Sequence, residues 1–171
     1  MTFDLLIKGG TLIDPAQKIH AQQDVAFANG VVAAVGKNLS KDKAREVVDA
    51  SERILTPGLI DLHVHVYYGV GHYGIEPDPT CLAKGATTVI DAGSSGADNF
   101  TGFRKYVIEV SETRILAYLN ISSQGMMTSE IGEFELPDYA NVNKACEIIE
   151  QHRDVILGVK ARLTRHRIAS E

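Results

Sequence analysis

The sequence lacks the features that mark secreted, membrane-spanning and zinc-finger proteins. Its 171 residues include two cysteines, five prolines and no tryptophan. Cys81 and Cys146 cannot form a disulfide framework and lack the spacing of a zinc motif, so we expect two small buried apolar groups in a cytoplasmic protein. No apolar run approaches the length of a membrane span, and the N-terminus has no signal-peptide pattern, so we expect no membrane partner.

A large excess of charge of one sign is also missing. The chain has 17 basic and 22 acidic residues, which gives a net charge of −5, and no run of like charges. Nucleic-acid-binding domains usually carry a basic patch or stripe, so we expect no nucleic-acid partner. With 44% hydrophobic and 23% charged residues, the composition is that of an ordinary globular protein.

The first 56 residues predict a small all-β lobe. The dipeptide Asn29-Gly30 is a strong signal for a two-residue hairpin, and Gly9-Gly10 is expected to close the first strand. So small a sheet has too little core to be stable alone, and we expect a β-sandwich-like lobe that needs the rest of the chain for its stability. The expected strands are residues 3–8, 24–28, 31–35, 46–49 and 53–55.

Residues 57–171 predict alternating strands and helices. This alternation favours βαβ units and a parallel sheet, either a doubly wound open sheet or a barrel. Asp98 is a plausible N-cap, and apolar stripes follow it and Asn141. The expected strands are residues 59–65, 87–92, 115–121 and 156–163, and the expected helices are 79–84, 99–110 and 141–152; the stripes are Phe100, Phe103, Val107 and Val110, then Val142, Ala145, Cys146 and Ile149.

The stretch LTPGLIDLHVHV, residues 55–66, has two histidines at the end of an apolar run. In a strand, alternate side chains share a face, so His63 and His65 point the same way, with Asp61 just below them. Two converging imidazoles form half of a metal site. The alternative is a pair of surface or hydrogen-bonded core histidines.

The stretch VILGVKARLT, residues 155–164, places Lys160 and Arg162 on one face of the last expected strand. A lysine in an apolar strand usually lies at the exposed end of that strand. The guanidinium of Arg162 suits bidentate binding of a substrate carboxylate, and neutralisation of nearby carboxylates is an equally good interpretation. The run DAGSSG, residues 91–96, lacks the spacing and lysine of a phosphate-binding loop, so we expect a tight βα turn.

The sequence resembles a known family. PGLIDLHVH is similar to the first-strand signature of the amidohydrolase superfamily, metal-dependent hydrolases built on a (β/α)8 barrel. The runs GATTVIDAGSSG, NFTGFRKYVIE and RILAYLNIS resemble the amidohydrolase/deacetylase subgroup, whose members are often named dihydroorotase. The resemblance implies an α/β fold, the N-terminal half of a (β/α)8 TIM-type barrel preceded by the all-β lobe. Residues 57–171 would supply four of eight βα units, because such a barrel needs roughly 250 residues.

The resemblance also implies the chemistry. In the binuclear branch of the superfamily, the two histidines and a carboxylated lysine hold two divalent metal ions, which here would be His63, His65 and Lys160. A lysine in an apolar site can keep a neutral amine, which adds CO2 to form the bridging carbamate. Zinc suits these ligands, although manganese, iron and cobalt can use them too. A metal-bridging hydroxide would then cleave an acyl ester or amide of a small-molecule substrate, such as an acetylated α-hydroxy or amino acid.

Three residues of the family site have no counterpart in this sequence, namely two histidines on strands five and six and the general-base aspartate on strand eight. His166 lies six residues after Lys160, and we expect a loop histidine there. Tyr68 and His72, with Tyr67, follow the histidine strand closely, so they are candidates for substrate contact, although solvation in a loop is at least as good an interpretation.

Alternatives remain within and outside the enzyme class. Dihydroorotase and D-aminoacylase activities use the same metal centre, so the residues present cannot separate them from a deacetylase. The chain can also be an inactive truncated fragment with an exposed sheet edge and an incomplete metal site. A homo-oligomer is compatible with the sequence.

Overall fold

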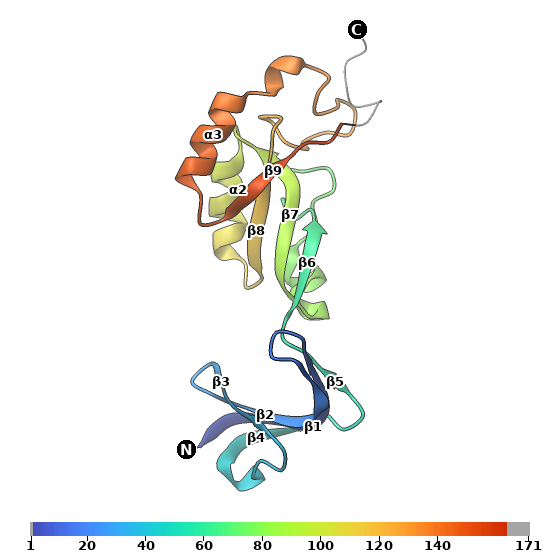
Figure 1. Cartoon of the computed structure of the whole chain (residues 1–171). Coiled ribbons are helices and arrows are strands. Elements are labelled where there is room, and N and C mark those ends of the chain that lie inside the picture. The colour runs from blue at the N-terminus through green and yellow to red at the C-terminus, as the bar shows by residue number, and fades with distance from the viewer. Residues whose placement is uncertain (1, 164–171) are drawn as a thin grey trace. The chain divides into compact units, whose positions relative to one another are not determined.

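The computed structural model describes residues 2–163 and divides the chain into two compact units, Met1–Pro57 and Gly58–Glu171 (Figure 1). Both units have the predicted type of secondary structure, since the first is all-β and the second alternates strands and helices. Within the described residues, no helix has the length and apolarity that a bilayer crossing requires.

The first unit is a five-stranded sheet in the order β3-β2-β1-β4, with β5 paired to β1. β2 is antiparallel to β1 and to β3, whereas β4 and β5 run parallel to β1. The elements are β1 (Phe3–Asp14), β2 (Ile19–Ala28), β3 (Val31–Gly36), the 3-10 helix η1 (Lys41–Lys43), β4 (Ala44–Asp49) and β5 (Ile54–Leu55).

Glycine acts in two different ways in this unit. Asn29 (φ 54°) and Gly30 (φ 75°) form the predicted hairpin turn, because both central residues of that turn need positive φ. The prediction that Gly9-Gly10 ends the first strand was wrong. β1 continues to Asp14, and its register with β2 shifts between Ile7 and Gly10, where Gly9 takes φ 76°.

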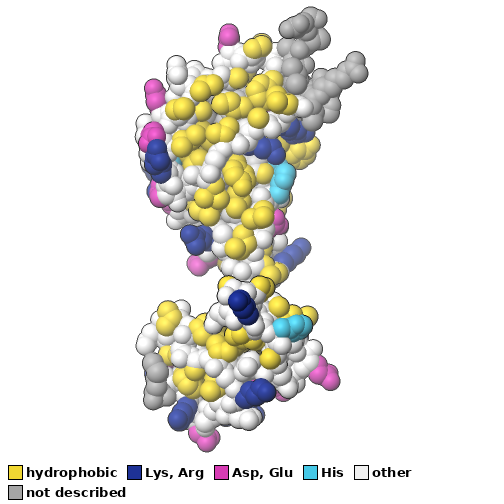
Figure 2. Space-filling view, viewed as in Figure 1, with side chains coloured by type: hydrophobic (Ala, Val, Ile, Leu, Met, Phe, Trp, Pro, Cys, Tyr) yellow, Lys and Arg dark blue, Asp and Glu magenta, His cyan; other side chains and the backbone are white. Residues whose placement is uncertain are grey.

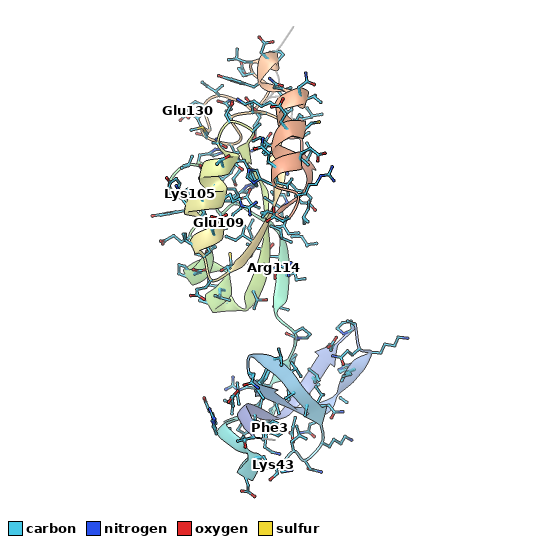
Figure 3. All side chains as sticks on the ribbon, turned by 90° about the vertical axis from the view of Figure 1, so that its left-hand side faces the viewer. Phe3, Lys43, Lys105, Glu109, Arg114 and Glu130 are labelled. Atoms are coloured by element: carbon cyan, nitrogen blue, oxygen red, sulfur yellow. The ribbon has the colours of Figure 1, made fainter. Side chains whose placement is uncertain are left out.

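The core of the first unit is small and carries a buried carboxylate beside it. Phe3, which Figure 3 shows among the strands, packs with Leu6 and Ala26. Asp24 accepts hydrogen bonds from Lys8 Nζ at 2.8 Å and from the backbone N–H groups of Gly9 and Leu39 at 2.9 Å. Burial alone would raise the pKa of Asp24, but these hydrogen bonds and the Lys8 charge outweigh burial and lower that pKa.

The second unit contains a four-stranded parallel sheet in the order β6-β7-β8-β9. The strands are β6 (Leu59–Val64), β7 (Ala86–Gly96), β8 (Arg114–Asn120) and β9 (Ile156–Lys160). The helices are α1 (Pro77–Thr80), η2 (Leu82–Lys84), α2 (Phe100–Tyr106), η3 (Ile108–Val110), η4 (Pro137–Tyr139) and α3 (Val142–Gln151). The predicted βαβ alternation is therefore confirmed.

Helices α2 and α3 lie on the same face of this sheet (Figure 1). Phe100 and Phe103 of α2 are fully buried with ring centroids 6.0 Å apart, as their stripe predicts, whereas Val110 is 70% exposed. In α3 the buried residue is Ala145, and Ile148 and Ile149 pack against the core. The expected burial of Val142 and Cys146 was wrong, since both are exposed; Cys81 is buried as expected.

The two helix starts differ from each other. Asp98 does not cap α2, because the N-cap residue is Asn99 and the Asp98 carboxylate instead binds the Ser123 hydroxyl and the Lys144 amine. Asn141 caps α3 by accepting a hydrogen bond from Lys144 N at 3.0 Å. The partners of Asp98 lie 25 and 46 positions further along the chain, so its hydrogen bonds depend on tertiary packing and not on the start of α2.

The parallel sheet has two distinct ends and two open edges in the part of the chain that the structure describes. Figure 3 shows Arg114, where β8 begins, at the end of the sheet opposite Glu130, which belongs to the loop after β8. Figure 2 shows apolar side chains gathered on the surface of this unit. On the outer strands, the exposed apolar residues are Leu59, Ile60 and Leu62 of β6 and Leu157 and Val159 of β9.

We predict that Asp24→Ala lowers the free energy of unfolding of the first unit by about 2–4 kcal/mol, because two partly buried N–H groups and a lysine lose their acceptor. Urea unfolding measures the loss, and Asp42→Ala, at an exposed position, is the control. Since the pKa of Asp24 is lowered on folding, its contribution is present above its unfolded pKa and disappears as the pH falls through the folded pKa. Equal stabilities of parent and Asp24→Ala at pH 7 would contradict this role.

Candidate metal centre

His63 and His65 lie where β6 ends, and their rings are close together in an edge-to-face arrangement. The ring centroids are 5.5 Å apart with an angle of 79° between the planes. Two imidazoles that bind one tetrahedral ion have ring centres about 5 Å apart, because each nitrogen lies roughly 2 Å from the metal. Asp61 is turned to the backbone instead, where its Oδ1 accepts a hydrogen bond from His63 N at 3.1 Å.

His65 is held as a neutral imidazole with one nitrogen engaged. Its Nδ1 lies 3.0 Å from the hydroxyl of Ser94, which leaves Nε2 for a ligand. Burial, together with the positive charges of His63, Lys160 and Arg162, lowers the pKa of His65 to about 4. The neutral imidazole is the form that binds metal ions, so this pKa favours ligation at neutral pH.

Lys160 ends β9 and is seated against a glycine of β7. A Cβ at Gly93 would lie 2.7 Å from both Cβ and Cγ of Lys160, so only glycine leaves room for the lysine stem. Gly93 also has φ 87°, and its carbonyl accepts a hydrogen bond from Asn120 Nδ2 at 3.0 Å. Because β7 lies between β6 and β8, this packing brings Lys160 to the sheet end that carries His65.

Arg162 follows β9 and pairs with a buried carboxylate. Its Nη1 lies 3.4 Å from Oε1 of Glu133, which is 4% exposed and belongs to the loop after β8. The strand ends at Lys160, so the expected extension through residue 163 was wrong. The ion pair with Glu133 fits the interpretation that Arg162 neutralises a carboxylate, and substrate binding by Arg162 stays a prediction.

The three residues of the loop after β6 separate in the structure. Tyr67 is a core residue whose ring lies 4.8 Å from Phe103. Tyr68 is exposed and lines a cavity of about 240 Å³ that residues of α1 and α2 also line and that neither His63 nor His65 reaches. His72 stays with the histidines, because its charge acts on His65 while its Nδ1 lies 3.0 Å from the carbonyl of Met126.

The donor set fits part of a binuclear metal site. Within residues 2–163, no group of three His, Cys, Asp or Glu side chains could hold a metal ion. The candidate metal ligands in this part of the chain are therefore the two histidines, His63 and His65, and a modified Lys160. A carbamate on Lys160 would add two oxygen donors to the two imidazoles, a mixture that zinc accepts. His166 lies outside the described residues.

Known proteins match both units of the chain, although no protein-family model does. A protein named deacetylase from Brucella anthropi is 36% identical over 135 residues, which cover 78% of this chain and 34% of that relative. A protein named dihydroorotase from Citrifermentans bemidjiense is 52% identical over 63 residues, or 37% of this chain and 15% of the relative. A crystal structure of a dihydroorotase matches with a TM-score of 0.88 and 30% identity, over 98% of this chain and 44% of that one. The chain belongs to the amidohydrolase superfamily.

The comparison also confirms the predicted fold class. The chain spans 34% of the Brucella deacetylase and 44% of the dihydroorotase structure. The parallel sheet of the second unit corresponds to the first part of an amidohydrolase (β/α)8 barrel, and the small β lobe precedes it in the sequence. The histidine pair and Lys160 thus lie at the carboxyl ends of barrel strands, which is where such barrels build their active sites.

A buried carboxylate beside the histidines was not predicted from the sequence. The expected tight turn at 91–96 was wrong, because β7 continues through Gly96. Asp91 in this strand is fully buried and accepts hydrogen bonds from the backbone N–H groups of Val66 and Ser94. Burial raises the pKa of Asp91, and these hydrogen bonds oppose that rise. An aspartate inside an apolar strand was the signal that could have marked it.

We predict that Gly93→Ala lowers the metal bound by the intact protein about tenfold or more, because the new methyl group displaces Lys160. Gly85→Ala is the matched control, since Gly85 also has positive φ (95°) but no atom within 4 Å of the added Cβ. Backbone strain alone costs each variant about 1 kcal/mol of stability. Elemental analysis of the purified intact proteins measures bound metal, and equal metal content in the two variants would disprove the seating of Lys160.

Proposed function

We propose that the intact protein is a binuclear metal-dependent hydrolase that cleaves an acyl ester or amide of a small molecule, as a deacetylase does. The observation that carries this proposal is the pair His63 and His65, with ring centroids 5.5 Å apart, at the sheet end to which Lys160 is brought by its packing against Gly93. Family membership and a relative named deacetylase support the reaction class.

The chain's own residues would hold the metal ions and orient the substrate. His63 and His65 supply neutral nitrogen donors, and a carbamate on Lys160 supplies the bridging oxygens. Two divalent cations, zinc by preference, would supply an activated water near neutral pH and polarise the carbonyl of the substrate. Arg162, partly buried beside Glu133, would bind a carboxylate of an acetylated α-hydroxy or amino acid.

Location and assembly belong to the same proposal. Cys81 and Cys146 are both free thiols, which supports action in the cytoplasm, where disulfides are rare. A homo-oligomer remains a prediction.

A second candidate function is the opening of a cyclic amide. A relative named dihydroorotase matches a shorter stretch of the sequence than the deacetylase does, at higher identity. A crystal structure of a dihydroorotase matches 98% of this chain at a TM-score of 0.88. Ring opening would use the same donors, so comparison of an acetylated α-hydroxy acid with dihydroorotate as substrates separates the two functions.

We predict that His63→Ala and Lys160→Ala each lower the bound metal and abolish hydrolysis of the acetylated substrate in the intact protein. Metal content and turnover are measured on the same samples. His20→Ala, an exposed histidine of β2, is the control and keeps both. Full activity with unchanged metal content in either site variant would disprove the assignment.

A further inference from the structure

The hydroxyl of Ser94 makes the contact that decides how His65 is presented. Ser94 is 2% exposed, and its Oγ lies 3.0 Å from Nδ1 of His65. A neutral imidazole carries its hydrogen on one nitrogen only, so the direction of this bond fixes which nitrogen can bind a metal ion. If Ser94 accepts, Nε2 is free; if Ser94 donates, Nε2 carries the hydrogen.

Asp91 determines that direction. The Ser94 hydroxyl also hydrogen-bonds the Asp91 side chain. Burial raises the pKa of Asp91, but the hydrogen bonds from Val66 N, Ser94 N and the Ser94 hydroxyl oppose that rise and favour the ionised form. An ionised carboxylate only accepts hydrogen bonds, so in this form the single hydroxyl hydrogen goes to Asp91 and the oxygen of Ser94 is left as an acceptor for His65 Nδ1–H.

Asp91 also fixes the backbone on both sides of this contact. Its Oδ1 accepts from Ser94 N at 2.6 Å, and its Oδ2 accepts from Val66 N, directly after His65, at 2.8 Å. The register between β6 and β7 shifts between Asp61 and Val64, and their last paired residues are Val64 and Asp91. Just beyond that pair, the Asp91 side chain accepts the hydrogen bond of Val66 N in place of a strand partner. One fully buried side chain thus connects the backbone of Val66, next to His65, with the backbone of Ser94.

We propose that Ser94 and Asp91 are positioning residues for His65, which hold its ring in the tautomer that presents Nε2 to a metal ion. This inference rests on the proposed function for its purpose, since the tautomer matters only if His65 binds metal. Partners of this kind typically change metal affinity by about 10- to 100-fold when they are removed.

The test uses the intact protein with 15N-labelled histidine. Long-range 1H–15N spectra of the metal-free protein report the tautomer of His65, and competition with a chelating dye reports the affinity for zinc. We expect His65 to carry its hydrogen on Nδ1 in the parent protein. In Ser94→Ala this preference is lost, and zinc binds about 10- to 100-fold more weakly.

Ser95→Ala is the matched control. Ser95 is the next residue of β7 and fully buried, and within the described residues its hydroxyl has no hydrogen-bond partner. It should keep the parent tautomer and affinity. Asp91→Asn, with a single oxygen left to accept hydrogen bonds, should change both quantities in the direction of Ser94→Ala.

The proposal is overturned if the parent protein carries the hydrogen on Nε2, or if Ser94→Ala keeps the parent tautomer. It is also overturned if zinc binds the parent and Ser94→Ala equally well. If the parent binds no zinc, the proposed metal-dependent function fails, while the tautomer comparison in metal-free protein still decides whether Ser94 and Asp91 orient His65.

Discussion

The parallel pairing of β6, β7, β8 and β9 is the constraint on which the site depends. Parallel strands place all of their carboxyl ends at one end of the sheet, so residues almost a hundred positions apart in sequence become neighbours. His65 follows the first strand, Ser94 lies in the second, and Lys160 ends the last. Gly93 lets the lysine stem pack against the second strand, and Asp91 of that strand fixes the backbone of the first.

The electrostatics of this end of the sheet are unbalanced. Burial lowers the pKa of His65, and the charges of the neighbouring cationic side chains and imidazoles act in the same direction. These neighbours are His63, Lys160, Arg162 and His72. Among the described residues, Glu133 pairs with Arg162, and Asp61 accepts a hydrogen bond from the backbone N–H of His63. Conversion of Lys160 to a carbamate would replace a positive charge by a negative one in the same place. The negative carbamate would attract metal ions, whereas the positive charge of Arg162 would attract an anionic ligand.

Features that follow from local spacing could be predicted from the sequence. The Asn29-Gly30 hairpin, the strand–helix alternation and the shared side of His63 and His65 depend on residues a few positions apart. Features that depend on distant partners were missed. Asp98 became a partner of Ser123 and Lys144 rather than a helix cap, and Ser94 met His65 across 29 positions. The bulge at Gly9 could not be distinguished from a strand end, because glycine permits both.

The most direct test of the metal centre is X-ray diffraction from crystals of the intact, zinc-loaded protein, measured at the zinc absorption edge. The account predicts two anomalous peaks within bonding distance of the donors His63, His65 and a carboxylated Lys160, with His65 bound through Nε2. Zinc peaks remote from these three residues, or zinc bound through Nδ1 of His65, would contradict it.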